Sequence, residues 1–76
     1  MIEEHERIAL TVDVPEHGLK AGDIGMVVHI YGQHTGYTVE FVTVTGRTVA
    51  LVSVFPEQIR ALEPDEIATA RRVATA

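Results

Sequence analysis

The stretch LKAGDIGMVV, residues 19–28, decides which fold this chain is expected to adopt. Gly22 permits a backbone turn that other residues avoid, and the Asp23 carboxylate can accept hydrogen bonds from neighbouring backbone N–H groups. Gly25 then allows a sharp start, or a bulge, before the apolar residues 26–28 begin to pair as a strand. The stretch therefore predicts a tight structural corner, made by Gly22, Asp23 and Gly25, that begins a β-strand.

Four further segments carry the signs of strands. Residues 7–14 alternate between apolar and small or polar side chains, which is typical of a half-buried strand that ends before Pro15. Short turns that contain glycine separate the next apolar runs, and such turns favour antiparallel hairpins. The expected order is strands at 7–14, 26–31, 37–44 and 48–55, a single 3-10 turn at 56–59 and a closing strand at 60–62. Five short strands in so short a chain indicate a mostly β fold, a small five-stranded barrel.

The tail has a different character. Pro64 suits the first position of a helix, and Arg71 and Arg72 suit the other end of its dipole. The sequence therefore predicts a short C-terminal α-helix, with a narrow apolar stripe formed by Ile67, Ala70, Val73 and Ala74. On this interpretation residues 1–62 form the barrel and residues 63–76 a helical tail that docks or frays.

The corner resembles the start of KOW-type, SH3-like small barrels. The longer order of motifs PEHGL, GDIG, YTVEF, GRTVAL and PEQIR, from about Arg7 to Leu62, resembles the family of short bacterial proteins described as domain of unknown function 4926. The resemblance implies an SH3-like barrel, and members of that family are associated with toxin-like gene neighbours. KOW-type relatives that bind nucleic acid carry basic loops at this corner. The loop here holds Glu16, His17, Lys20 and Asp23 instead.

Composition and charge exclude several classes of protein. With 46% hydrophobic and 22% charged residues, the 76-residue chain is expected to form one globular domain. Its net charge is −5 and its six Lys and Arg residues are scattered, so binding to nucleic acid is disfavoured. Without cysteine, a partner subunit is the expected supplement to so small a core. No run approaches the roughly 20 apolar residues of a membrane span, and the acidic N-terminus does not resemble a signal peptide, so we expect a cytoplasmic protein.

Residues that could carry chemistry are few. The four histidines include no His-x-x-x-His pair, so we expect no metal and no cofactor. The one serine, Ser53, lies within a predicted strand, and Glu40 alternates with apolar neighbours and is expected to face solvent. The sequence therefore predicts a protein that is not an enzyme.

Two surfaces are candidates for binding. The segment 48–55 is apolar on both faces, so either the tail and the barrel's curvature cover the second face, or part of it meets a partner. The candidate interface consists of Val42, Val44, Ala50, Val52 and Val54. A second candidate, a recognition patch, consists of Tyr31, His34 and Tyr37, which could equally cap the end of the barrel.

Three hypotheses for function remain. The first is a non-catalytic protein-interaction module, in its most concrete form an antitoxin-like protein that binds a neighbouring gene product. The second is a KOW-type module that contacts RNA through Lys20, Arg47 and Arg60. The third is an accessory subunit of a larger enzyme. Self-association of the chain is compatible with all three.

Overall fold

A computed structural model describes residues 1–73, and in it the chain forms one antiparallel sheet of five strands. Two short 3-10 turns interrupt the strands, and the sheet order is β4-β3-β2-β1-β5. The mostly β fold predicted from the sequence is confirmed. The elements are β1 (Arg7–Leu10), η1 (Pro15–His17), β2 (Ile24–Tyr31), β3 (Gly36–Val42), β4 (Thr48–Val54), η2 (Pro56–Gln58) and β5 (Ile59–Ala61).

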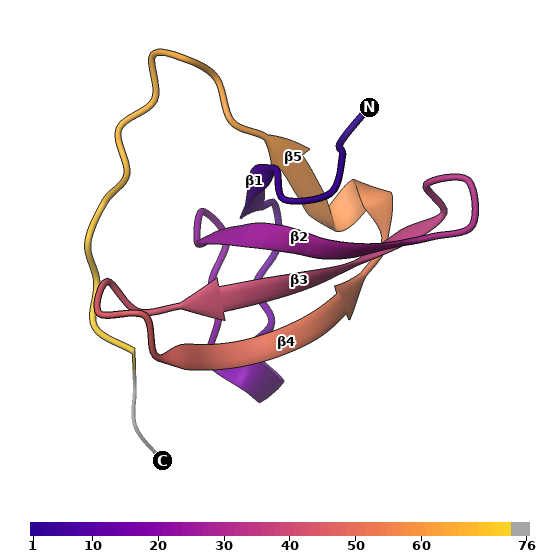
Figure 1. The fold of residues 1–76 in the computed structure, drawn as a ribbon. Coiled ribbons are helices and arrows are strands. Elements are labelled where there is room, and N and C mark those ends of the chain that lie inside the picture. The colour runs from indigo at the N-terminus through magenta and orange to yellow at the C-terminus, as the bar shows by residue number, and fades with distance from the viewer. Residues whose placement is uncertain (74–76) are drawn as a thin grey trace.

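The sheet curves, so that β1 and β5 lie behind the layer formed by β2, β3 and β4 (Figure 1). The core fills the concave side, and the loop before β2 adds to it. Four side chains in it are almost fully buried, namely Ile8, Leu10, Val27 and Val39. The core is therefore built from the inward-facing residues of every strand.

The first strand is shorter than predicted. It ends at Leu10, because Thr11 turns toward the other end of the chain: its N–H donates to the Gln58 carbonyl at 2.8 Å and its hydroxyl to the Glu57 carbonyl at 2.8 Å. Ala9 is buried as well, although the alternation placed it outside. The 3-10 turn η1, between β1 and β2, was not predicted either.

The predicted corner at Gly22 and Asp23 is present. Gly22 has a φ of +93°, which a residue with a side chain rarely adopts, and the Lys20 N–H donates to the Asp23 carboxylate at 2.8 Å. Gly25 has a different role from the predicted bulge: a Cβ there would lie 2.5 Å from Cγ1 of Val39 and 2.8 Å from the Phe41 ring. It is glycine because two core side chains pack against its backbone.

The bulge lies instead at Val28, between the pairs that Val27 and His29 make with β3. Val27 faces the core opposite Val39, and His29 faces the other side opposite Thr38. The extra residue explains why apolar Val27 and Ile30, three positions apart, point to the same side of the sheet.

The predicted C-terminal α-helix is wrong for the residues that the structure describes. Residues 63–73 contain a turn at 64–65 and otherwise no regular structure, and Ala74 lies outside the described residues. Ile67, the largest residue of the expected stripe, is 88% exposed, so the sheet provides no packing for the apolar side of a helix at this residue. A three-turn helix without a buried face is not stable in water. The tail instead passes along one side of the sheet (Figure 1).

Among residues 1–73 the structure contains no helix of the length and apolarity that a membrane crossing would need.

Candidate protein-interaction surface

The convex side of β2, β3 and β4 carries an unusual set of exposed side chains. Strand register places on one side the residues opposite each other at the pairs His29–Thr38, Glu40–Leu51 and Thr38–Ser53. We call this side the outer face, and its residues are Met26, His29, Tyr31, Thr38, Glu40, Val42, Leu51, Ser53 and, just beyond β4, Phe55.

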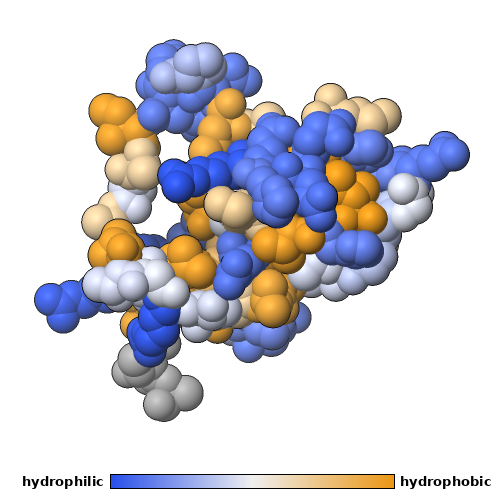
Figure 2. Space-filling view, in the orientation of Figure 1, coloured by the Kyte–Doolittle hydropathy of each residue, from blue (hydrophilic) through white to orange (hydrophobic). Residues whose placement is uncertain are grey.

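Four large side chains on the outer face are exposed to solvent. The exposed fraction is 43% for Tyr31, 50% for Val42, 59% for Leu51 and 65% for Phe55. Single exposed apolar residues are common, but several on one side of a small sheet are typical of a docking surface. The surface is mixed, because hydrophobic and hydrophilic residues alternate across the visible side of the molecule (Figure 2).

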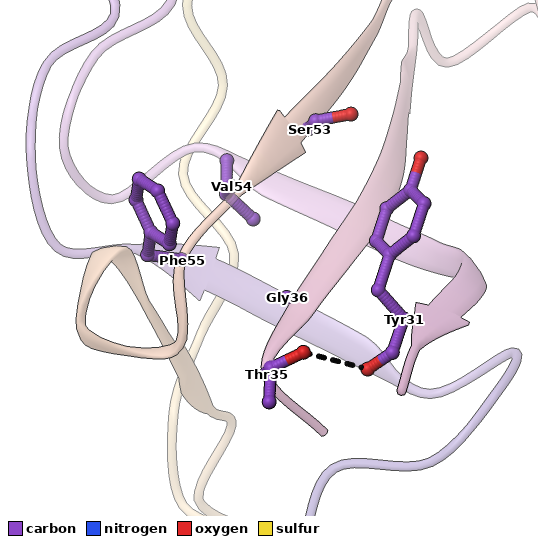
Figure 3. Close-up of a pocket in the computed structure, with 6 residues that line it drawn as sticks. All are labelled: Tyr31, Thr35, Gly36, Ser53, Val54 and Phe55. Atoms are coloured by element: carbon purple, nitrogen blue, oxygen red, sulfur yellow. Dashed lines mark hydrogen bonds between the residues drawn. The ribbon is translucent and has the colours of Figure 1, made fainter. Parts of the chain in front are cut away.

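A pocket of about 260 Å³ lies on the outer face, at the C-terminal end of β4. Tyr31 and Phe55 form opposite walls and Ser53 and Val54 lie between them (Figure 3). The hydroxyl of Thr35 donates to the Tyr31 carbonyl at 3.1 Å, which fixes the turn at the remaining side. The sixth lining residue is Gly36, where a Cβ would lie 3.6 Å from Cδ2 of Tyr31. The pocket exists partly because this position has no side chain.

Hydrogen bonds and a ring contact hold Tyr31 in place. Its hydroxyl lies 2.8 Å from Oγ1 of Thr38, and the His29 ring meets the Tyr31 ring edge-on, with centroids 4.6 Å apart. Hydrogen bonds from Ser53 and then from Thr38 lower the pKa of the Tyr31 hydroxyl. The Tyr31 ring is thus held in one position and forms an apolar wall of the pocket with a hydroxyl at its end. Tyrosines of this kind are common at protein interfaces.

The interface predicted from the sequence combines two opposite faces. Val52 and Val54 are 8% and 5% exposed, because register places them opposite Val39 and Tyr37 in the core. Ala50 is half-buried on the same inner side. Val42 lies on the outer face, and Val44 is fully exposed in the following turn.

Leu51 and Phe55 are the surface residues that the sequence prediction missed. The signal that could have found both is the alternation within 48–55 itself, once the core side is fixed by pairing with Val39.

The recognition patch predicted from Tyr31, His34 and Tyr37 does not form. Ile30 pairs with Tyr37 and Tyr31 with Gly36, so the two tyrosines point to opposite sides of the sheet. Tyr37 is 4% exposed and packs in the core, with the His34 ring edge-on at 6.2 Å.

The histidines of the described residues do not come together in a common site. The His34 Nε2 atom is 3.4 Å from a Glu3 carboxylate oxygen, and it has no hydrogen-bond partner within the described residues. Over residues 1–73, no three histidine or acidic side chains lie close enough together to hold a metal ion.

Two of the scattered cations are neutralised within the chain. Arg60 donates from both terminal nitrogens to the two carboxylate oxygens of Glu66, at 2.8 and 2.7 Å. Arg71 donates to both carboxylate oxygens of Asp23, with an Nε–Oδ1 distance of 2.8 Å. The ion pairs lower the positive potential that a polyanion would meet.

The sequence of the chain matches the family described as Domain of unknown function (DUF4926) over residues 4–61. The chain belongs to the DUF4926 family. The DUF4926 match includes all five strands and the outer face, and it ends at Ala61, before the tail. No curated protein and no solved structure shows significant similarity to the chain.

Proposed function

We propose that this chain is a non-catalytic protein-interaction module that binds a protein partner through its outer face. The observation that carries the proposal is the pocket between Tyr31 and Phe55, which opens on the same outer face as exposed Leu51 and Val42. An apolar pocket with a few fixed hydroxyl groups suits one inserted apolar or aromatic side chain of a partner.

The fold that we propose for this role is an SH3-like barrel. The strand order β4-β3-β2-β1-β5 and the 3-10 turn η2 between β4 and β5 support it, as does the long loop between β1 and β2. The support for a non-catalytic role comes from the pocket lining. Its polar side chains are the hydroxyls of Tyr31, Thr35 and Ser53, and neither a histidine nor a carboxylate lines it to act as a base.

The charge of the chain specifies the chemistry of the partner. With a net charge of −5, the molecule attracts a basic protein and repels an acidic one at long range. Glu40 on the outer face holds a negative group near the exposed apolar residues, and its Oε2 accepts a hydrogen bond from Thr48 at 2.9 Å. We therefore propose a cationic partner with an exposed apolar side chain, such as a basic toxin-like or enzyme protein that this chain neutralises or supports.

A quantitative binding experiment tests the proposal. The tagged chain is used to capture partners from its native host, and the affinity of the recovered protein is then measured for the unchanged chain and for Phe55→Ser. Loss of an aromatic anchor costs about 2 kcal/mol, so we expect roughly a 30-fold weaker Kd. Val44→Ser is the control, because it removes an equally exposed apolar side chain outside the outer face. Capture of no protein, or equal affinity of both variants, would contradict the proposal.

RNA binding by Lys20, Arg47 and Arg60 is the alternative, and it has weaker support. Arg60 is already paired with Glu66, which leaves fewer free cations to displace counterions from phosphate. A flat response to polynucleotide at low salt would remove this alternative.

A further inference from the structure

The two edges of the sheet differ in how they are protected. β5 has three residues, one of which is Arg60, so it offers a short and charged edge. β4 has seven residues, TVALVSV, without charge, proline or glycine. Long, uncharged edge strands pair readily with other strands, and natural proteins normally protect such edges with charge, proline or short length.

The backbone of β4 has free hydrogen-bonding groups on its outer edge. Its only strand partner is β3, and no other described segment forms a backbone hydrogen bond with residues 48–54. The N–H and C=O groups that point away from β3 therefore lack a partner strand within residues 1–73. An added strand would satisfy them, as in other cases of strand addition.

We propose that β4 pairs in antiparallel fashion with β4 of a second copy of this chain, around a two-fold axis close to Leu51. A second copy is the occupant that the strand itself favours, because an uncharged strand can face its own copy without repulsion. Centring the pair on Leu51 lets all seven residues of each strand overlap. It also places the two Leu51 side chains side by side on the outer face, where each is now 59% exposed.

Charges at the two ends of β4 fit this arrangement. Arg47 precedes the strand and Glu57 follows it, and neither forms an ion pair within the described residues. Antiparallel pairing brings Arg47 of one copy to the end at which Glu57 of the partner subunit lies. The same happens at the opposite end, so the dimer gains two contacts of opposite charge.

The pairing leaves the proposed binding pocket accessible. A two-fold axis perpendicular to the sheet keeps both outer faces on the same side, so the dimer presents two pockets to one partner surface. The inference is independent of the proposed function, because an edge-paired dimer can form whether or not a foreign protein binds the pocket.

Sedimentation velocity of the full chain over a wide concentration range is the test. We expect the mass to rise from 8.3 kDa toward twice that value as concentration rises. Leu51→Lys should abolish the rise, because a lysine at the centre of the edge blocks pairing and faces its own copy. Val44→Lys adds the same charge at an exposed turn position and should leave the dimer intact. A mass of one chain at every concentration, or a dimer that survives Leu51→Lys, would overturn the proposal.

Charge reversal at the exposed strand ends is a second measurement that leaves the core untouched. Arg47→Glu and Glu57→Arg should each weaken dimerisation roughly threefold, and the double variant should recover it. Loss of dimerisation that the double variant does not recover would contradict the antiparallel arrangement. Failure of the pocket variant Phe55→Ser to weaken foreign binding would count only against the proposed function.

Discussion

Arg71 joins the C-terminal tail to Asp23 at the corner that begins β2, 48 residues earlier in the chain. The Nη2 atom of Arg71 also donates a hydrogen bond to the Gly18 carbonyl, at 3.0 Å. The same carboxylate accepts the Lys20 N–H, so Asp23 serves both the corner and the tail. The ion pair thus links the segment shared with the family to a segment outside it.

Replacement of Arg71 by alanine should release the tail while leaving the sheet folded. The contact is partly exposed, so we expect a loss of at most about 1 kcal/mol in the free energy of unfolding. Amide exchange of residues 67–73 should become faster, and exchange of β2 and β3 should stay unchanged. Arg72→Ala is the control, and equal exchange in both variants would show that Arg71 does not hold the tail.

The contribution of Asp23 should depend on pH. Burial of the carboxyl favours its neutral form, but hydrogen bonds from Arg71 and from the Lys20 backbone outweigh burial and lower its pKa in the folded protein. A lowered pKa stabilises the fold above the unfolded value of about 4, and this stability is lost as pH falls through the folded pKa. Asp23→Asn should therefore be less stable than the unchanged chain at pH 7, with the difference shrinking below about pH 4. Urea unfolding at several pH values measures it, and a difference independent of pH would contradict the prediction.

Glu66 should stay ionised to a lower pH than an ordinary glutamate, down to about pH 2. A hydrogen bond from Arg60, followed by one from the Glu63 backbone, lowers the pKa of Glu66 to about 2. Titration of side-chain carboxyl signals by NMR should show it as the last glutamate to take up a proton. In Arg60→Gln the pKa should return toward its ordinary value of about 4, and Arg47→Gln is the control.

Gly25→Ala should be strongly destabilising. The new methyl group would enter the space of Val39 and the Phe41 ring, and overpacking of this kind costs about 1–3 kcal/mol. Gly36→Ala is a matched control within the same sheet, because its nearest contact is an ordinary 3.4 Å. Chemical denaturation measures both variants, and equal stabilities would show that β2 can shift away from the core.

Truncation of two neighbouring residues of β4 should change the folding stability by very different amounts. Val52→Ala removes buried methyl groups and should cost about 2 kcal/mol of folding stability. Leu51→Ala removes a larger but exposed side chain and should change stability by less than about 0.5 kcal/mol. Similar losses from the two variants would contradict the assignment of inner and outer faces.

Local signals predicted much of this fold. Glycine geometry and turn chemistry gave the corner at Gly22 and Asp23, and the apolar runs located every strand to within a few residues. These features depend on neighbours in the sequence. The tail was different: its helical signals were real, but nothing in the sequence showed that it lacks a surface to pack against and that Arg71 reaches Asp23 instead.

The candidate site was only partly predictable, because a strand's alternation does not say which side is inside. The segment 48–55 is apolar on both sides, and only its pairing with β3 decides that Val52 is buried and Leu51 exposed. Similarly, Tyr31 and Tyr37 are close in sequence, but the hairpin register sends them to opposite sides.

The bulge in β2 has a consequence for how this strand tolerates change in length. Because Val28 is the unpaired extra residue, a chain that lacked it would keep His29, Ile30 and Tyr31 on their present sides. Removing His29 or Ile30 would instead turn the Tyr31 side chain toward the core, and removing His29 would also expose Ile30 to water. Of the eight residues of β2, Val28 can thus be deleted without changing which side of the sheet the later side chains face.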